Sequence, residues 1–167
     1  MKFRLGLLLV LLSFACAPAA DIQGKVLMSG IFKMSKEVES VKSPQTPSGV
    51  TSASAGRFIL VSQTNRIPAR LGIRFGFWYE INNLPIRDGD LVELIKVVKH
   101  PAITKPDGAT SKGFEFTETP VVTDGRAKGW TGYGFDERFE LAIGTWEFEM
   151  QYKGATLCKC SFDVVKD

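Results

Sequence analysis

Residues 144–165, GTWEFEMQYKGATLCKCSFDVV, constrain the fold of this chain more than any other stretch. The first half alternates polar residues with apolar ones, which are Trp146, Phe148, Met150 and Tyr152. A period of two is typical of a strand with one apolar and one wet face. Lys153-Gly154 then provides a turn, and the alternation resumes through Thr156, Cys158, Cys160, Phe162 and Val164. The stretch predicts a β-hairpin, and because a lone hairpin is marginal in water, its apolar face needs a second sheet as cover.

Several other segments have strand character and are separated by Gly, Pro, Asn and Asp turn signals. They are residues 22–33, 57–64, 72–81, 91–99, 113–119, 126–135 and a short strand at Phe139 and Leu141. In residues 91–99 both parities are apolar, which favours a bulged or centrally buried strand over a short helix. About eight strands with regular turn signals predict an all-β fold, a two-layer antiparallel β-sandwich of the immunoglobulin-like type. A closed β-barrel is the alternative.

The N-terminus, MKFRLGLLLVLLSFACAPAAD, has the pattern of a secretory signal peptide. Two basic residues precede an apolar run that is too short to span a bilayer, and Ala17-Pro18-Ala19 fits a signal-peptidase site. We therefore expect residues 1–19 to be removed and the mature protein to be periplasmic or secreted. A lipoprotein anchored through Cys16 is the alternative. Residues 20–56 are expected to form an N-terminal strand and a flexible, Ser- and Pro-rich loop of the same domain, whose main body is residues 57–167.

Removal of residues 1–19 leaves 148 of the 167 residues, enough for one domain with a core of its own. The leader holds two of the 21 basic residues, so 19 remain against 18 acidic ones and the mature net charge is about +1. No segment has the Lys/Arg density of a nucleic-acid-binding surface. No second apolar run is long enough to span a membrane, and no motif indicates a cofactor. The partner and the oligomeric state stay open.

Three segments occur in an order that resembles a known family. They are TNRIPARLGIRFGFWYEI at residues 64–81, VVKHP at 97–101 and GTWEFEMQYKGATLCKCSFDV at 144–164. The chain resembles the bacterial domain-of-unknown-function family 3859 over nearly all of its mature length. The resemblance implies a compact exported β domain, and it implies no activity and no catalytic residues.

Cys158 and Cys160 are the only cysteines left after export, and at positions i and i+2 of a strand both thiols face the same way. Two buried apolar thiols, a strained disulfide, and a redox or metal-handling pair are the three readings. His100 is the sole histidine and comes directly before Pro101 at a strand end, so we expect it to be structural. The carboxylate pairs, among them Glu115/Glu118 and Glu147/Glu149, are interpreted as parts of solvent-exposed strand faces or turns.

The segment 129–135, GWTGYGF, interleaves glycines with Trp130, Tyr133 and Phe135. Exposed aromatic rings stack on sugars and peptides. Trp78, on the polar side of its strand, is a fourth candidate for the same surface. The alternative is that these rings cap the two ends of the core. No catalytic motif is present, so the sequence favours a non-catalytic binding or accessory domain at the cell envelope, with a protein or glycan partner. A thiol-redox or metal-handling protein that uses Cys158 and Cys160 is the alternative.

Overall fold

The computed structural model describes residues 21–35, 40–52 and 58–167. The predicted signal peptide, its cleavage site and the Cys16 alternative lie outside these residues. The same holds for part of the predicted loop, at residues 36–39 and 53–57. No described helix is long and apolar enough to cross a membrane.

The regular secondary structure of the described chain is β-strand apart from one 3-10 turn, as the alternating pattern predicts. The described strands are β1 (Gln23–Met34), β2 (Ser40–Lys42), β3 (Val50–Ser52), β4 (Phe58–Ser62), β5 (Arg66–Pro68), β6 (Arg74–Asn82), β7 (Leu94–Thr104), β8 (Thr110–Glu118), β9 (Val122–Thr123), β10 (Arg126–Gly134), β11 (Gly144–Tyr152) and β12 (Ala155–Val165). Several of them are only two or three residues long, which is why the sequence predicted about eight.

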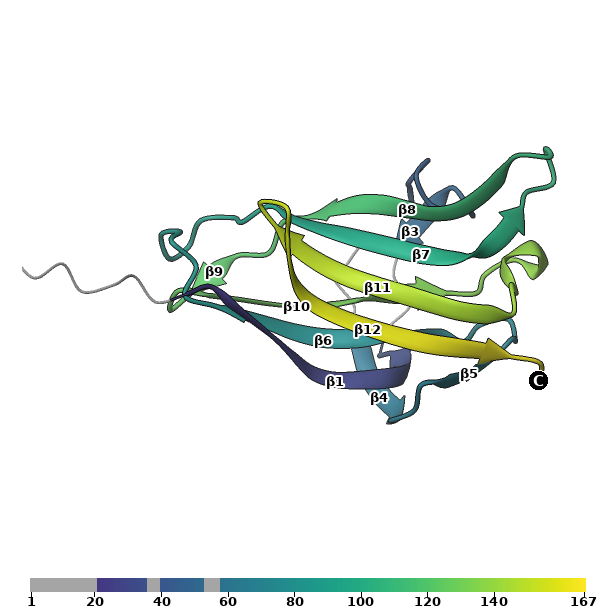
Figure 1. Ribbon diagram of the computed structural model, residues 1–167, viewed down its shortest axis with the longest axis horizontal. Helices are drawn as coiled ribbons and strands as arrows, with labels where there is room; N and C mark the ends of the chain where they lie inside the picture. The colour runs from purple at the N-terminus through teal and green to yellow at the C-terminus, as the bar shows by residue number, and fades with distance from the viewer. Residues whose placement is uncertain (1–20, 36–39, 53–57) are drawn as a thin grey trace, which may run out of the picture.

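Ten of these strands form two five-stranded sheets that pack face to face (Figure 1). One sheet has the order β4-β1-β6-β10-β9 and its pairs are antiparallel. The other has the order β5-β12-β11-β7-β8, and only its short edge strand β5 pairs in parallel. This is the two-layer immunoglobulin-like sandwich that the sequence predicted.

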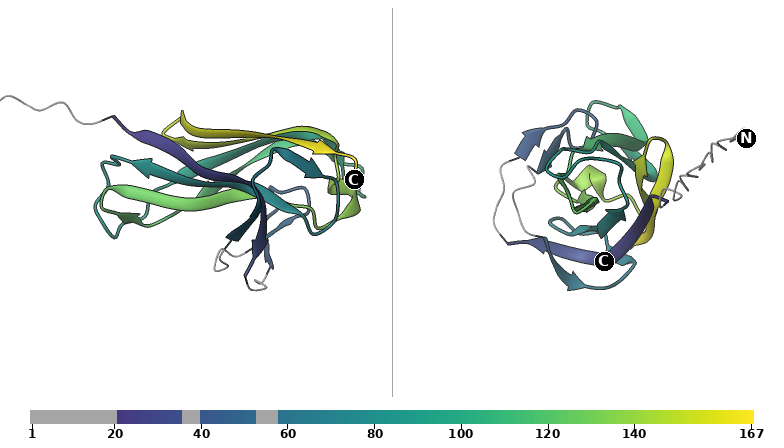
Figure 2. Two further views of the ribbon diagram at one scale, coloured as in Figure 1. Left: turned by 90° about the horizontal axis from the view of Figure 1, so that it is seen from below. Right: turned by 90° about the vertical axis from the view of Figure 1, so that its left-hand side faces the viewer.

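Aromatic rings fill the space between the sheets, and Phe75 of β6 lies at their centre. Its ring contacts Phe135 within its own sheet layer, and it contacts Trp146, Phe148 and Phe162 from the opposite sheet at centroid distances of 5.4–5.6 Å. Edge-to-face pairs of this kind add about 0.5–1.5 kcal/mol each beyond the burial of their surface. The end-on view in Figure 2 shows the strands arranged around this core.

The C-terminal hairpin forms as predicted, except that a bulge between Met150 and Gln151 places Thr156 on the outer face, where its hydroxyl bonds Glu149. β11 and β12 pair in antiparallel register from Gly144↔Val164 to Tyr152↔Ala155. The turn places Lys153 and Gly154 at φ 48° and 82°, a region that glycine adopts without steric cost. The four apolar residues of β11 are buried, and Cys158, Phe162 and Val164 on β12 face the same core.

Two further predictions about local structure are wrong. Residues around Phe139 and Leu141 do not form a strand, because residues 138–140 form a 3-10 turn with a Glu137–Glu140 capping box. The predicted loop of residues 35–56 contains a small hairpin, since β2 pairs with β3 in antiparallel register. Its connection is closed by a hydrogen bond of 2.8 Å from the Ser43 amide to the Gly49 carbonyl. Sequence periodicity missed this hairpin because each of its strands has only three residues.

Candidate functional site

The four aromatic candidates divide between the two faces of the β4-β1-β6-β10-β9 sheet. Tyr133 is 6% exposed and Phe135 is fully buried, so both belong to the core and neither belongs to an exposed surface. Trp78 and Trp130 lie directly opposite each other on β6 and β10 and are half-buried on the outer face. The expectation of one exposed surface made by all four rings is therefore wrong for Tyr133 and Phe135. The physical reason is the strand period, which sends residues 133 and 135 to the side opposite residue 130.

On the outer face, Trp130 is clamped between other rings. It stacks on Phe58 of the edge strand β4 with centroids 3.7 Å apart, and Phe32 of β1 meets it edge-on at 5.8 Å. A Cβ atom at Gly132 would come within 2.5 Å of the Trp130 ring, so this glycine makes room for the indole to lie over the strand. The Trp78 indole donates a hydrogen bond of 3.3 Å to the Phe58 carbonyl. Trp78 and Trp130 thereby join β6, β10 and β4 on one face.

A polar cluster lies between the sheets at the seam where β8 faces β10. Glu118 of β8 accepts hydrogen bonds from the Tyr79 hydroxyl (3.1 Å) and the Thr131 hydroxyl (3.0 Å). Lys96 of β7 donates a hydrogen bond of 2.5 Å to the Gly132 carbonyl of β10. Because Tyr79, Thr131 and Gly132 belong to one sheet and Lys96 and Glu118 to the other, these contacts connect the two layers through side chains. We call Lys96, Glu118, Tyr79 and Thr131 the seam cluster.

Burial opposes the charge on both ionisable groups of the seam cluster. Removal from water raises the pKa of Glu118, and the nearby Lys96 and the two donated hydroxyl bonds only partly offset this effect. Burial likewise lowers the pKa of Lys96, against the attraction of Glu118. The charge on Lys96 and the charge on Glu118 therefore each stabilise the other. Their hydrogen bonds to Tyr79, Thr131 and Gly132 join the two sheets, which leaves little capacity for an outside ligand.

The seam cluster was not predicted from the sequence. The interpretation of Glu118 as part of a solvent-exposed strand face is wrong. Glu118 shares its strand parity with Phe114 and Phe116, which were expected to point inward, and Lys96 shares the parity of Leu94 and Val98. Parity alone would have placed both charges inside. The signal was overlooked because a charged residue at a strand end is usually solvated.

His100 is buried in an aromatic environment and is placed as a structural residue. Its ring lies 4.8 Å from that of Trp146, and its Nδ1 is 2.7 Å from the Pro101 carbonyl, which makes it the donor there. Its Nε2 is buried and has no hydrogen-bond partner among the described residues. Burial lowers the pKa of His100, although the contact with Pro101 acts in the opposite direction.

The two thiols face the core near β1, and they are not bonded to each other. Cys158 is buried and Cys160 is partly buried, and both are free. Burial and the neighbouring Cys160 raise the pKa of Cys158 to about 11, and burial also raises that of Cys160. Since the thiolate is the reactive form, both residues are poor nucleophiles at neutral pH. The described residues contain no group of three or more His, Cys, Asp or Glu side chains suited to a metal ion.

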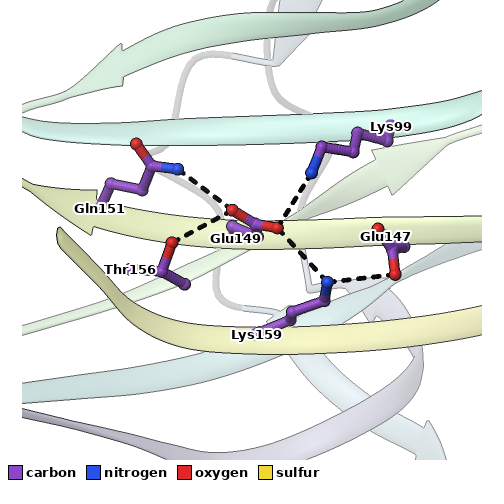
Figure 3. Close-up of polar contacts among 6 residues, drawn as sticks. All are labelled: Lys99, Glu147, Glu149, Gln151, Thr156 and Lys159. Carbon is purple, nitrogen blue, oxygen red and sulfur yellow. Dashed lines mark hydrogen bonds and ion pairs between the residues drawn. The ribbon is translucent and has the colours of Figure 1, made fainter. Parts of the chain in front are cut away.

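The opposite outer face, over β7, β11 and β12, is covered by a charged network (Figure 3). Glu149 accepts bonds from Lys99 (3.3 Å), Gln151 (3.1 Å) and Thr156 (3.2 Å), and Lys159 bridges it to Glu147. Burial favours the protonated form of Glu149, but these donors outweigh it and lower the pKa of this carboxyl. Glu147 and Glu149 do lie on an outer face, as predicted, and their oxygens are occupied by protein donors.

The two packed sheets define an immunoglobulin-like β-sandwich. The chain belongs to the family described as a domain of unknown function, DUF3859, whose model matches residues 21–164. The resemblance seen in the sequence is thus confirmed. The comparison with curated proteins found no match.

Among solved structures, the chain is similar to an immunoglobulin-like protein from Pseudomonas aeruginosa. The two are 22% identical with a TM-score of 0.60, and the alignment covers 89% of this chain and 100% of that one. At this identity the likeness supports the fold alone. The alkylpurine DNA glycosylase AlkC of Pseudomonas fluorescens, bound to DNA containing an abasic site analog, is 10% identical with a TM-score of 0.41. The alignment covers 60% of this chain and 27% of the glycosylase chain, and a similarity this low supports no conclusion about this chain.

The mutual dependence of the two charges in the seam cluster can be tested with the variants Lys96→Met, Glu118→Gln and their combination. Each single change leaves a partner group uncompensated, so we expect a loss of about 1–3 kcal/mol in the free energy of unfolding. The double variant should lose at least about 0.5 kcal/mol less than the sum, because the two groups depend on each other. Urea unfolding measures all three. Strictly additive losses would show that the two charges act independently.

His100 should make the fold sensitive to acid. A folded-state pKa below the unfolded value of about 6.5 means that the stabilisation is present above that pH and is lost as pH falls through the folded pKa. Wild type should therefore lose more unfolding free energy than His100→Asn between about pH 7.5 and about pH 5. Acidification acts on Glu118 with the opposite sign, but equally in both proteins, so their difference isolates His100. Equal pH slopes in urea unfolding would contradict the assignment.

Proposed function

We propose that this chain is a non-catalytic binding domain that acts in the cell envelope after export. The placement of exposed apolar side chains carries the proposal. Eight large hydrophobic side chains are exposed among the described residues, and four of them lie on the paired strands β1 and β4. They are Leu27 (41% exposed), Met28 (40%), Ile59 (40%) and Val61 (59%). Exposed apolar groups gathered on neighbouring elements are typical of interaction surfaces.

This concentration lies beside the outer tryptophans. Met28 is paired with Trp78 across β1 and β6, and Trp130 stacks on Phe58 at the start of β4. We call the four exposed residues together with Trp78 and Trp130 the β1–β4 surface, which includes both sides of this sheet margin because Ile59 faces away from Phe58. Half-buried aromatic rings give a contact area that loses little conformational entropy on binding, which suits an envelope protein or a glycan as partner.

The ionisable groups of the interior support a role without catalysis. The thiols of Cys158 and Cys160 are held protonated, and the seam cluster uses its hydrogen bonds to join the sheets. A catalytic nucleophile needs an adjacent base or a lowered pKa, and neither thiol has one. These observations disfavour the thiol-redox and metal-handling alternative. On such folds, function is usually carried by surface strands and loops.

Binding through the β1–β4 surface can be tested by capture from envelope extract with the full chain as bait. The variant Leu27→Asp/Met28→Asp places charges on the proposed surface without touching the core. We expect it to lose the partners that wild type retains, because a carboxylate in an apolar contact must be desolvated. The matched control Leu71→Asp/Ile143→Asp changes two apolar residues that are similarly exposed elsewhere on the domain. If the two variants capture the same proteins as wild type, this surface is not the contact.

Export has its own test, the intact mass of the chain purified from envelope and cytoplasmic fractions. We expect an envelope protein that begins at Ala20 or Asp21, because cleavage after Ala19 or Ala20 fits the small-residue pattern. A diacylglycerol adduct on Cys16 would establish the lipoprotein alternative. Full-length protein confined to the cytoplasm would contradict export.

A further inference from the structure

The four sheet edges of this sandwich are protected against further strand pairing to different degrees. An edge strand presents unpaired backbone groups, and proteins commonly block such edges with charge, proline or very short strands. β8 carries the exposed charges Lys112 and Glu115, and β5 is a three-residue strand with Arg66 and Pro68. β9 has two residues and covers only Arg126 and Ala127 of β10, and the next residue of β10, Lys128, carries an exposed charge. These three edges are therefore guarded.

β4 is the exception among the described edges. Its sequence, Phe-Ile-Leu-Val-Ser, has no charge and no proline, and among the described strands it pairs only with β1. The pairing with β1 has a bulge at Val61, because Ile31 pairs with Ser62 and Phe32 pairs with Leu60. This bulge disturbs only the second half of β4. Residues 58–60 continue in regular register with Lys33 and Met34. The first half of β4 is thus a regular strand whose outer edge has no protective residue.

From this edge we propose that the domain binds its partner by β-strand addition: an extended peptide segment with apolar residues at alternate positions pairs with the free edge of β4. The inference rests on the proposed binding function and specifies the partner and its mode of binding. Main-chain hydrogen bonds would supply affinity, and side-chain contacts on the two faces would supply specificity. The added strand would place one set of side chains beside Phe58 and Leu60 on the outer face and the other set beside Ile59.

The size of the edge favours a peptide over a second copy of the chain. Five paired residues span about 17 Å and bury far less than the roughly 1,200 Å² typical of stable protein–protein interfaces. A peptide contact can be strengthened by the neighbouring rings, because Phe58 already stacks on Trp130 and its backbone carbonyl is held by Trp78. This anchoring keeps the edge in place before a partner arrives, which lowers the ordering cost of binding.

The chain itself provides a suitable probe. Residues 29–35, Ser-Gly-Ile-Phe-Lys-Met-Ser, contain the β1 segment that pairs in antiparallel register with the opposite, inner edge of β4, so their side chains are compatible with this strand. A capped, fluorescein-labelled peptide of this sequence, titrated with the full chain, should give saturable fluorescence anisotropy. A peptide carrying Ile31→Pro and Lys33→Pro should not bind, because proline removes two of the donors that a strand needs. Saturable binding of the proline peptide would overturn strand addition.

The edge variant Ile59→Lys/Val61→Lys supplies the missing protective charges and should weaken peptide affinity at least tenfold. The matched control Leu91→Lys/Val121→Lys, at residues that are 60% and 53% exposed away from β4, should stay within twofold of wild type. Circular dichroism verifies the fold of both, and Ile59→Thr/Val61→Thr is compared instead if the lysine variant does not fold. Absence of wild-type binding, or equal affinity in the edge variant and wild type, would overturn the proposal.

Sedimentation of the wild-type chain completes the test. A concentration-dependent dimer that disappears in Ile59→Lys/Val61→Lys would show that a second copy occupies the edge, which would also overturn the proposal. If the peptide fails to bind while envelope capture remains sensitive to Leu27→Asp/Met28→Asp, strand addition is wrong and the binding function stands. If both fail, the binding function falls as well.

Discussion

The packing of aromatic rings around Phe75 is the interaction on which the rest of this structure depends. One ring contacts Phe135 and three rings from the opposite sheet, so it ties both layers to a single centre. Removal of a buried Phe side chain from such a position costs about 3–5 kcal/mol, against a net stability of about 5–15 kcal/mol for a whole domain. Every other feature of the sandwich, including its edges and both outer faces, is positioned by this core.

The two outer faces of the sandwich differ in a way that indicates which one meets a partner. Over β7, β11 and β12, Glu149 and its lysine, glutamine and threonine donors form a polar layer (Figure 3). Over β1, β4, β6 and β10, the side chains include Trp78, Trp130 and exposed Met28. Protein donors bond the carboxylates of the first face, whereas the second face leaves apolar side chains exposed. The interior seam is closed by Lys96 and Glu118, so the second face is where binding would bring the larger gain in buried apolar surface.

The two-residue period of apolar side chains predicted the architecture well. The predictions failed where amino-acid composition was given more weight than this period. In the C-terminal hairpin the pairing, the turn and most of the inner face follow from the alternation, and only the bulge that moves Thr156 to the outer face does not. In the segment 129–135, grouping rings by composition placed Tyr133 and Phe135 with Trp130, although their parity assigns them to the core.

Other parts of the candidate site could not be predicted in this way. Glu118 and Lys96 have inward parity, but their role depends on partners from two strands of the opposite sheet, which no local pattern reveals. These partners are Tyr79 of β6 and Thr131 and Gly132 of β10. The unguarded edge of β4 is also a property of sheet order, because a strand is an edge only relative to its neighbours. Sequence period thus determines which face a residue occupies, and topology determines what that face meets.

The central claim, that partners contact the β1–β4 margin of the sandwich, is tested most directly by a hydrogen-exchange footprint of the complex captured from envelope extract. Amide exchange followed by mass spectrometry, with and without the bound partner, locates the contact along the chain. We predict added protection from amide exchange in β1 and β4, residues 23–34 and 58–62, with little change in the β11–β12 hairpin. Protection confined to β8 and β10, or to the charged face over β11, would contradict it.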